Sequence, residues 1–484
     1  MMTVGERPDM RDLREFVRAI EDRGQLERVP GADLDLEIGG VSSLARQDAL
    51  DTALLFEDIE GTRPGARVLT NAVDTPLQVT LALGHEPTND IREAVVAQKE
   101  QAAEMQTRPV ETVDDGPVLE NVQRGGEVDL TEFAAPTWHA HDGGPYIGTG
   151  DVVITEHAEE DDRNAGTYRV QVHGPKTATL NIRPGRDGDR HRQSYFERGE
   201  PFPAVVSLGH QPDLFMAANQ RFPAHVDELE YVSAQRDRPL ETVEGEATGL
   251  PFPARSELVI EGTVHPDAEE ITEGPFGEWT GYYGAGETQQ RPFEIDRIYH
   301  RNDPIVLAYN NVPMTATAMS TIRSGAQLWH QLEDAGITGI DEVTTIFPGI
   351  WFQVVSIEQQ YAGHSTQVGM QAMSLPSGVW EGRITIVVDE DVDVYDLAEV
   401  LWATVSRCDP AEDLTVIENC VSSRINPRMS PEQTASGDHT KSRMLLDATK
   451  PYHWKEEFPE DTRIDPELEA ELRTAYAELL STGE

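Results

Sequence analysis

The segment Glu273–Glu278 carries the strongest sign of chemistry in this chain. Its sequence, Glu-Gly-Pro-Phe-Gly-Glu, places two carboxylates five residues apart. Glycine and proline exclude a regular helix here, so we expect a shaped turn. Paired acids beside an aromatic ring suit general acid–base catalysis, because apolar surroundings can raise the pKa of one carboxyl toward neutrality. A solvated acidic turn is the alternative, since acids are abundant throughout the chain.

The whole chain is strongly acidic, with 39 Lys+Arg against 87 Asp+Glu and a formal net charge of -48. Hydrophobic residues still make up 38% of its 484 residues, enough for two or three folded domains. Dense carboxylates with few lysines suit a cytoplasm at molar salt, so we expect a halophilic source. The charge argues against binding to nucleic acids or to anionic membranes.

Cysteine usage and hydropathy indicate which structural classes and cell compartments are expected for this protein. Only Cys408 and Cys420 are present, which excludes a disulfide framework and a cysteine-based metal site. No apolar run approaches the roughly 18 residues that a membrane helix requires. The N-terminus is polar and has no apolar signal core. We therefore expect a soluble, cytoplasmic protein.

The sequence of the N-terminal part predicts a small α/β structure. Residues 9–23 form an amphipathic pattern that Asp9 can cap and Gly24 can end, with apolar side chains at Leu13, Phe16, Val17 and Ile20. Residues 51–83 alternate short apolar runs with turns, and residues 110–128 read as a polar connection.

The residue pattern changes between residues 129 and 310. Short β-rich runs separated by Gly, Pro and Asp turns predict a sheet or a barrel, interrupted by a helical stretch at 214–236. The runs are 152–154, 168–172, 204–208, 258–260 and 305–309.

From about residue 320 the pattern is α/β again. Residues 384–388 predict a buried strand, followed by the acidic loop 389–393 and by a helix through 397–405. By composition the loop could be a metal site. A last helix is expected from Asp465-Pro466. Its stripe of Leu468, Leu472 and Leu479 suits packing or a partner subunit.

Several motifs now occur in a specific order along nearly the whole chain. They are Asn164-Ala165-Gly166-Thr167-Tyr168-Arg169, Pro184-Gly185-Arg186, Glu228, Ser256 to Gly262, Glu273 to Glu278, Tyr361 to His364, Asp389 to Asp393 with Trp402-Ala403, and Arg443 with Leu446 to Thr449. In this order they resemble the UbiD family of decarboxylases, which use prenylated FMN. The resemblance implies an N-terminal α/β domain (1–128), a central split β-barrel that binds the flavin (129–320) and a C-terminal α/β dimerisation domain (321–484). It also favours a structural role for the acidic loop 389–393 over a metal site.

The resemblance also implies an activity. Family members decarboxylate aromatic or α,β-unsaturated carboxylic acids reversibly, with the flavin as electron sink. Arg169 matches the arginine that holds a carboxylate and pairs with an acid, Glu273 matches that acid, and Glu278 matches the proton donor to the product carbon. The expected catalytic residues are therefore Arg169, Glu273 and Glu278.

The family's metal, usually manganese with potassium nearby, links the flavin phosphate to an Asn, a His and a Glu. Asn164 and Glu228 match two of these ligands. Many relatives have His directly after Pro-Gly-Arg, where this chain has Asp187. Either Asp187 ligates as a hard oxygen donor, or His191 moves in, or the metal site is altered. For His191, the favoured interpretation is a solvated residue in a charged loop.

Other residues are expected to hold the cofactor itself. Gly166, Thr167 and Tyr168 match the backbone contacts to the flavin, with Asn164 and Arg169 beside them. Arg443, with Lys441 as the fallback, falls where the family has a basic residue for the flavin phosphate. Residues 207–212 resemble a further flavin-lining loop.

The resemblance implies partners as well: an unsaturated or aromatic acid as substrate, a flavin prenyltransferase as cofactor supplier, and a second copy of the chain in a homodimer or higher homo-oligomer. Two other functions stay open. One is a non-catalytic subunit or binding protein with an altered metal site, which the Asp187 substitution favours. The other is an ordinary FMN oxidoreductase, for which no glycine-rich dinucleotide motif is found.

Overall fold

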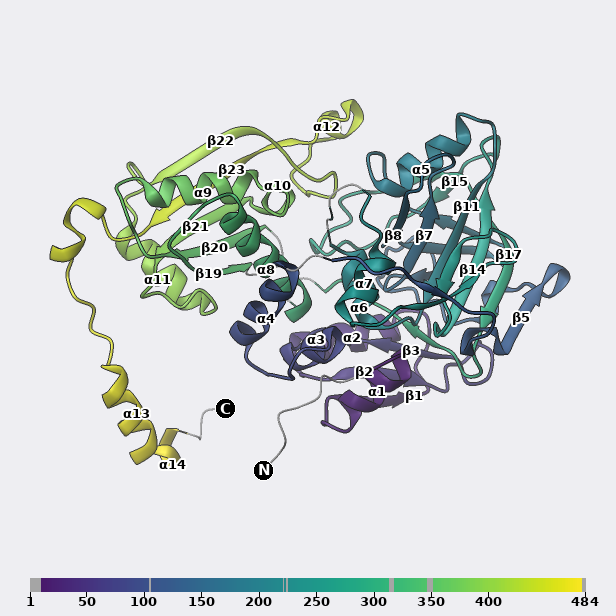
Figure 1. The fold of residues 1–484 in the computed structure, drawn as a ribbon, viewed down its shortest axis with the longest axis horizontal. Helices are drawn as coiled ribbons and strands as arrows, with labels where there is room; N and C mark the ends of the chain where they lie inside the picture. Colours follow the sequence, from purple (N-terminus) through teal and green to yellow (C-terminus); the bar gives the residue numbers. More distant parts are fainter. Residues whose placement is uncertain are drawn as a thin grey trace.

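The protein consists of three domains, and the central one is built on a curled sheet (Figure 1). The computed structural model describes residues 10–103, 106–220, 222, 225–312, 317–345 and 351–480. An N-terminal α/β domain lies beneath a split barrel, and a C-terminal α/β domain lies beside both. The multidomain α/β fold with a central split barrel is therefore confirmed.

The first helix, α1 (Leu13–Glu21), follows its amphipathic pattern, because Leu13, Phe16, Val17 and Ile20 are all buried. Its cap is Asp12, whose side chain accepts from the Glu15 amide, so the helix begins later than the sequence indicated. The expected cap, Asp9, lies outside the described residues.

The N-terminal sheet has the order β1-β2-β3-β18. Its strands are β1 (Leu26–Pro30), β2 (Ala53–Glu57), β3 (Arg67–Thr70) and β18 (Ile305–Leu307), and the helices of this domain after α1 are α2 (Glu37–Gln47), α3 (Pro76–Leu83) and α4 (Ile91–Ala103). The prediction of small α/β structure at 51–83 is confirmed.

Strand β18 was expected in the barrel, and that expectation is wrong. It pairs in parallel with β3 instead. Its side chains alternate between two cores: Ile305 and Leu307 pack in the cluster shared by the outer domains, whereas Val306 packs in the barrel cluster. A strand buried on both faces has no polar side to mark its sheet, so the sequence pattern left its partner open.

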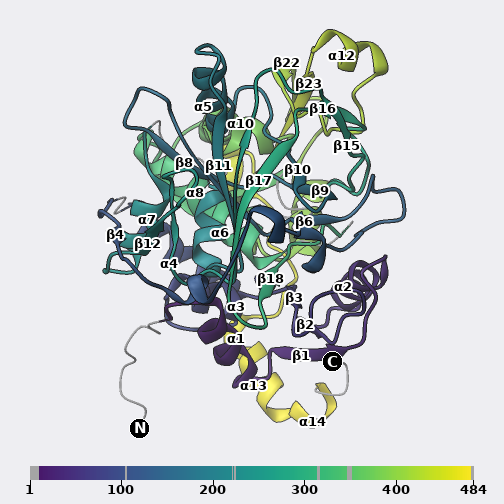
Figure 2. The ribbon, with the colours of Figure 1, turned by 90° about the vertical axis from the view of Figure 1, so that its right-hand side faces the viewer.

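The barrel sheet has the order β6-β9-β10-β17-β14-β11-β7-β8, with β5 also on β17. Its strands are β5 (Asn121–Arg124), β6 (Tyr146–Gly148), β7 (Val152–Glu156), β8 (Arg163–Gly166), β9 (Val170–Gly174), β10 (Thr177–Leu180), β11 (Phe202–Leu208), β14 (Leu258–Val264) and β17 (Phe293–His300). Register shifts in three of its pairings bend the strands and help the sheet to curl. Figure 2 looks onto this sheet.

Two sequence interpretations of this region need correction. Residues 110–128 are more than a polar connection, since they contain β4 (Glu111–Thr112), the 3-10 helix Pro117–Glu120 and β5. Two short 3-10 helices, Gly125–Glu127 and Leu130–Glu132, follow. The stretch 214–236 holds two helices, α6 (Pro212–Ala218) and α7 (Glu228–Gln235), and a third helix, α5 (Asp187–Phe196), was not predicted.

Smaller sheets border the barrel. One has the order β13-β12-β4, with β12 at Glu241–Glu244 and β13 at Pro251–Pro253. The other is the antiparallel pair β15 (Ile271–Glu273) and β16 (Thr288–Gln290), whose connecting loop contains the Glu273–Glu278 segment.

The C-terminal domain is a five-stranded sheet of order β19-β20-β21-β23-β22. Its strands are β19 (Ile340–Thr345), β20 (Phe352–Ile357), β21 (Ile384–Asp389), β22 (Leu414–Val421) and β23 (Thr440–Ala448); its helices are α8 (Ala318–Asp334), α9 (His364–Ser374), α10 (Gly378–Glu381), α11 (Leu397–Arg407) and α12 (Pro431–Ser436). The predicted strand at 384–388 and the helix at 397–405 are confirmed. In the acidic loop, Arg407 holds Asp389 at 3.0 Å and Asp391 at 2.8 Å, which supports a structural role.

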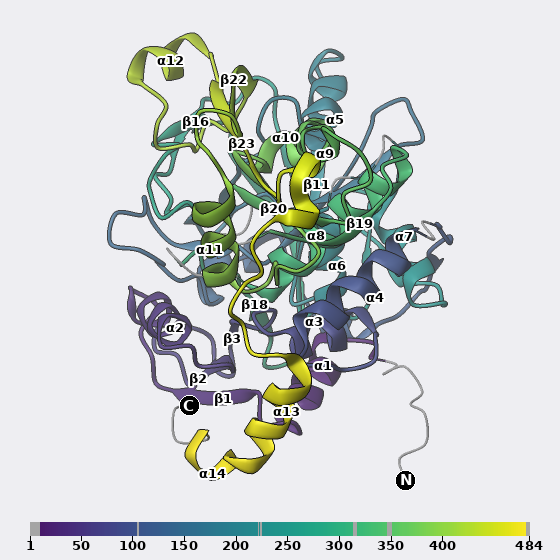
Figure 3. The ribbon, with the colours of Figure 1, turned by 90° about the vertical axis from the view of Figure 1, so that its left-hand side faces the viewer.

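The chain ends in an arm that stands away from the body (Figures 1 and 3). After the 3-10 helix Tyr452–Glu457, an extended segment leads to α13 (Pro466–Ala475) and α14 (Ala477–Leu480). The predicted cap Asp465 accepts from the Glu467 and Leu468 amides. Leu468, Leu472 and Leu479 are exposed on this arm. Among the described residues, no helix is long and apolar enough to cross a membrane.

Candidate active site

The Glu273–Glu278 segment is a buried loop on the barrel. Glu273 ends β15 with no exposed surface, and Glu278 is 7% exposed, so the expectation of a solvated turn is excluded. Gly274 has a φ of +89°, a conformation that favours glycine. At Gly277 an added Cβ would lie 2.5 Å from the His139 ring, so only glycine fits. The apolar member, Phe276, packs 4.5 Å from the Tyr146 ring.

Arg169 connects the two acids of this loop. Its Nε and Nη2 atoms donate to the two oxygens of Glu273 at 2.7 and 3.0 Å. Its remaining terminal nitrogen, Nη1, donates to Glu278 Oε1 at 2.6 Å. The guanidinium also lies 5.1 Å from the Phe276 ring. A single fork therefore holds both carboxylates, as a planar guanidinium is suited to do.

Glu273 is an anchor whose charge the site stabilises. Its oxygens also accept from the Tyr146 hydroxyl at 3.0 Å, from the Asn181 amide at 2.6 Å and from the Thr288 hydroxyl at 3.0 Å. Burial favours the neutral acid, but the hydrogen bond and charge of Arg169 outweigh it and lower the pKa of Glu273. The same environment raises the pKa of the buried Tyr146 phenol, mainly through burial and the neighbouring carboxylate.

Glu278 has fewer partners. Its Oε1 atom accepts from Arg169 and, at 3.1 Å, from Arg183 Nη2. Among the described residues, no partner is recorded for its Oε2 atom. Burial and nearby arginines lower the pKa of Arg183. Sequence reasoning missed Arg183; the available signal was a cation directly before the Pro184-Gly185-Arg186 motif.

A second cluster lies on the other side of the segment 164–169. The Glu228 carboxylate, at the first turn of α7, accepts from the Asn164 amide at 3.2 Å and from the Ala165 backbone amide at 2.8 Å. The Tyr168 hydroxyl donates to Asn164 Oδ1 at 2.9 Å. Burial raises the pKa of Glu228 to about 8, and the charges of Asp227 and Asp187 add to this.

Asp187 and His191 both lie on α5 but differ in surroundings. Asp187 starts the helix with a side chain that is 63% exposed, near enough to raise the pKa of Glu228 and of Tyr168. His191 is fully buried, with Nε2 2.9 Å from Asp162 and Nδ1 2.9 Å from Thr155. The expectation of a solvated His191 in a loop is wrong, because a helix turns this ring into the protein, where its two nitrogens lie against Asp162 and Thr155.

The remaining predicted cofactor residues fall into two groups. Gly166, Thr167 and Tyr168 lie between the two clusters, and the Thr167 hydroxyl donates to Asn219 at 3.2 Å. Lys441 and Arg443 lie on β23 in the C-terminal domain, where Arg443 donates to four backbone carbonyls and Lys441 to Gln433. Within the part of the chain that the structure describes, no contact joins them to the barrel clusters.

The C-terminal domain nevertheless reaches the Glu278 loop. Trp279 meets Trp351 edge to face at 5.1 Å, and Trp351 lines a small pocket with Lys441 and Arg443. Residues 207–212 contribute differently from expectation: His210 lines a separate cavity that shares no residue with either cluster.

This arrangement combines three capabilities. A fixed cation can orient a carboxylate, a second acid is placed for proton transfer, and an adjacent set of oxygen ligands suits a hard divalent cation. The donors Asn164, Glu228 and Asp187 suit such an ion, because the Glu228 carboxylate is buried and the nearby charges of Asp227 and Asp187 add to the rise in its pKa, which a bound cation would offset.

Comparison with known families matches almost the whole chain. Models described as the N-terminal, Rift-related and C-terminal domains of 3-octaprenyl-4-hydroxybenzoate carboxy-lyase, under the family label UbiD, match residues 17–97, 111–313 and 317–448. Curated relatives include phenolic acid decarboxylases of Bacillus subtilis (strain 168), 31% identical over 91% of this chain and 92% of the relative, and of Streptomyces sp. (strain D7), 29% identical over 98% and 96%.

Solved structures agree with these matches. The UbiD-class enzyme HmfF from Pelotomaculum thermopropionicum, in complex with FMN, superposes with a TM-score of 0.82 at 28% identity, covering 95% of this chain and 98% of that one. The open form of Sedimentibacter hydroxybenzoicus vanillic acid decarboxylase gives a TM-score of 0.83 at 27% identity, covering 98% and 99%.

Proposed function

This chain belongs to the UbiD family of carboxy-lyases, and we propose that it catalyses the reversible, non-oxidative decarboxylation of an aromatic or α,β-unsaturated carboxylic acid with prenylated FMN. The observation that carries the proposal is the Arg169 fork, which holds Glu273 and Glu278 together in a buried site. FMN and prenylated FMN are bound by the similar enzyme HmfF, and phenolic acids are named as substrates of the curated relatives.

Four side chains have distinct roles in the proposed reaction. Glu273, ionised and held by five hydrogen bonds, fixes Arg169. Arg169 and Arg183 orient the substrate carboxylate by charge-assisted hydrogen bonds. Bound prenylated FMN supplies the electron sink for loss of carbon dioxide. Glu278 in its acid form then gives its proton to the carbon that lost the carboxylate, and the two arginines stabilise the glutamate that remains.

The metal site follows from the second cluster. We propose that Asn164, Asp187 and Glu228 hold a divalent cation, with Mn2+ favoured by the oxygen donors and K+ as a further ion nearby. Such a cation would supply positive charge for the flavin phosphate. His191 is not a ligand in this proposal, because Asp162 and Thr155 occupy both of its ring nitrogens. Gly166, Thr167 and Tyr168 line the flavin beside Asn164 and Arg169.

The C-terminal domain completes the site in this proposal. Lys441 and Arg443 line a small pocket with Trp351, and we propose that they add positive charge to the part of the site that the C-terminal domain contributes. The exposed stripe of Leu468, Leu472 and Leu479 on the arm is proposed to pack against a second copy, giving a homodimer or a higher homo-oligomer. A flavin prenyltransferase is the expected supplier of the cofactor, and the cytoplasm of a halophile the expected location.

Cofactor and metal content test the proposal directly. The chain is co-expressed with a flavin prenyltransferase and purified in high KCl with manganese. We expect one prenylated FMN per chain by mass and absorption, stoichiometric manganese, and carbon dioxide release from a panel of aromatic and unsaturated acids. Asp187→Asn and Glu228→Gln should each lower the bound manganese, whereas Asp267→Asn, an exposed acid away from the cluster, should not.

A different outcome would favour another function. A well-folded protein that takes up neither cofactor nor metal would mean that Asp187 marks a lost site, and a non-catalytic subunit would then lead. Plain FMN with hydride exchange to a nicotinamide would favour an oxidoreductase.

A further inference from the structure

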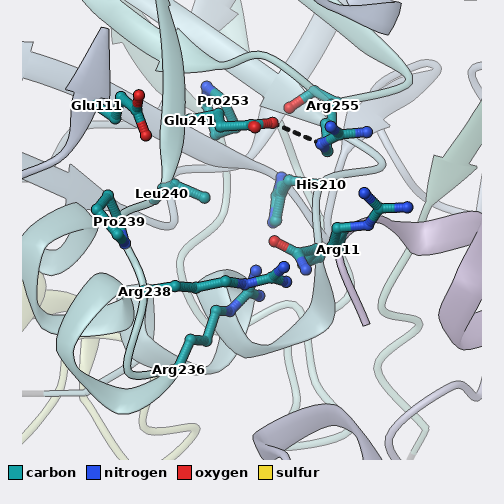
Figure 4. Close-up of a pocket in the computed structure, with 12 residues that line it drawn as sticks. Arg11, Glu111, His210, Arg236, Arg238, Pro239, Leu240, Glu241, Pro253 and Arg255 are labelled. Carbon is teal, nitrogen blue, oxygen red and sulfur yellow. Dashed lines mark hydrogen bonds and ion pairs between the residues drawn. The ribbon is translucent and has the colours of Figure 1, made fainter. Parts of the chain in front are cut away.

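A cavity of about 170 Å3 lies outside both clusters, where the N-terminal segment meets the barrel (Figure 4). Its walls come from Arg11 ahead of α1, from the start of α6, from the chain after α7, and from β4, β12 and β13. A single water needs only roughly 10–15 Å3 of space open to its centre. The cavity is therefore large enough for a small molecule.

The wall of this cavity carries mostly positive charge, whereas the molecule as a whole is strongly negative. The chain has 39 basic and 87 acidic residues, about one to two. The cavity wall reverses this ratio, with four arginines and two glutamates: Arg11, Arg236, Arg238, Arg255, Glu111 and Glu241. In Figure 4, Arg236 and Arg238 approach from one side, Arg255 and Arg11 from others, and His210 lies between them. Such a concentration of guanidinium groups creates a positive potential that attracts anions.

The arginines are held in place by the surrounding protein. Asp213 of α6 accepts from both Nε and Nη2 of Arg236 and so fixes its guanidinium group. Arg238 donates to the Met10 carbonyl at 2.8 Å, which the Gln211 amide also contacts at 2.5 Å. Arg255 donates through Nε to Glu241 at 2.7 Å, its one recorded acceptor among the described residues. Groups fixed in this way lose little freedom when a ligand binds.

His210 provides a second, independent sign of a ligand. The ring is 1% exposed and lines the cavity, and its Nδ1 lies 3.3 Å from Ser207 Oγ. Its Nε2 atom is buried without a hydrogen-bond partner among the described residues. Burial lowers the pKa of His210 to about 3, so the ring is neutral at physiological pH. A buried ring nitrogen without a partner is costly unless something in the cavity bonds to it.

We propose that this cavity binds a small oxyanion of the phosphate type, held by Arg255, Arg238 and Arg236 with His210 as a neutral hydrogen-bonding partner. Guanidinium forks match the oxygen geometry of phosphate, and a hydroxyl of the same ion can satisfy Nε2. Arg11 lines the same cavity from the segment ahead of α1, so the charge of the ion would also strengthen the contact between that segment and the barrel. This site is separate from the proposed cofactor site and does not depend on the proposed reaction.

Calorimetric titration of inorganic phosphate into the full-length, cofactor-loaded protein tests the proposal. Cofactor loading keeps the proposed flavin-phosphate site filled, and the KCl concentration is held constant. Arg255→Gln should weaken binding roughly tenfold, because a charge-assisted hydrogen bond is lost. Glu241→Gln should tighten binding severalfold, because it removes the carboxylate that competes for Arg255. The matched control is Arg124→Gln, an exposed arginine paired with Glu246 outside the cavity.

The opposite signs of the two variants separate binding from a general loss of stability, since misfolding cannot strengthen binding. A second titration with glycerol 3-phosphate identifies the source of the ligand: preference for inorganic phosphate indicates the free ion, and preference for the ester indicates a phosphorylated metabolite. Absence of binding heat, or equal affinities in Arg255→Gln, Glu241→Gln and Arg124→Gln, would overturn the proposal.

Discussion

The two acids of the Glu273–Glu278 loop differ in what the protein leaves them free to do. Both oxygens of Glu273 are occupied by donors, so this carboxylate serves as a fixed counter-charge for Arg169. In Glu278 both recorded donors meet Oε1. Among the described residues no donor meets its Oε2 atom, so in the proposed reaction this asymmetry favours Glu278 over Glu273 as the acid.

Glu278→Gln should therefore lower the decarboxylation rate by about 10²- to 10⁴-fold, the usual contribution of a general acid. Cofactor binding should change little, because glutamine keeps the size of the side chain. Rate and flavin content are measured together. Glu287→Gln, an exposed acid on the same loop, is the control and should retain activity. An active Glu278→Gln protein would remove Glu278 from the mechanism.

Asp151 is a second residue whose ionisation has a consequence, this time for stability. The side chain is 1% exposed, its Oδ2 has no hydrogen-bond partner among the described residues, and burial raises its pKa to about 8. Between its ordinary pKa of 3.8 and about 8, the folded protein holds a proton there that the unfolded chain releases. The free energy of unfolding must therefore fall as the pH rises through this window.

Asp151→Asn removes this titration while keeping the shape of the side chain. We expect the variant to gain stability relative to the natural chain between pH 6 and pH 9, by about 1 kcal/mol or more. Denaturant unfolding of both proteins at the two pH values, in the same KCl concentration, measures the difference. A constant gap between them would show that Asp151 is already charged in the fold. Asp267→Asn, at an exposed position, should show no such change.

At the scale of elements, periodic segments were predictable and buried strand partners were not. The α1 stripe of Leu13, Phe16, Val17 and Ile20 and the α13 cap at Asp465 follow from local chemistry, and both are present. Strand β18 was assigned to the wrong sheet because both its faces are apolar. The break between α6 and α7 was missed although the joining residues signal it, since they include Pro223 and the N-cap of α7, Asp227.

The candidate site shows the same division. The order of motifs was sufficient to select Arg169, Glu273 and Glu278, which the structure brings together. Arg183 was missed although a cation directly precedes the Pro184-Gly185-Arg186 motif, and the buried position of His191 was missed because it depends on how α5 packs against the barrel. Helix packing is set by contacts between distant residues, and a single sequence does not show these contacts.

A close contact between the C-terminal domain and the loop after Glu278 is the element-scale feature through which we expect the two domains to influence the proposed reaction. At Gly284, six residues after Glu278, an added Cβ would lie 2.2 Å from the Ile425 carbonyl oxygen. This carbonyl belongs to the chain between β22 and α12. The two backbones therefore approach as closely as they do only because residue 284 is glycine.

Gly284→Ala should move the loop or the C-terminal segment apart, at a cost of about 1–3 kcal/mol for the local rearrangement. We expect kcat/KM to fall severalfold while the melting temperature changes by only a few degrees. Gly174→Ala is the matched control, since it has no atom near the added Cβ. Equal kinetics for the two variants would mean that this contact has no part in catalysis.

At the scale of the whole molecule, the excess of carboxylates is the dominant physical feature. With 87 acidic and 39 basic residues, most carboxylates cannot be paired with a cation from the same chain. Many recorded ion pairs are exposed, such as Arg124–Glu246 and Arg198–Glu159, and contribute little on their own. Repulsion among the remaining carboxylates opposes the compact state, and dissolved salt must screen it.

The melting temperature should therefore rise with KCl, by roughly 10 °C between 0.1 M and 3 M. Screening predicts the shape of the curve as well as its direction. The Debye length falls from about 10 Å at 0.1 M to about 3 Å at 1 M, so most of the electrostatic gain should be reached by about 1 M. A further steady rise above that concentration would come from exclusion of salt from the protein surface. Thermal unfolding across a KCl series measures both parts. A melting temperature that does not change with KCl would contradict the predicted halophilic origin, because it would show that the acidic surface is stable without molar salt.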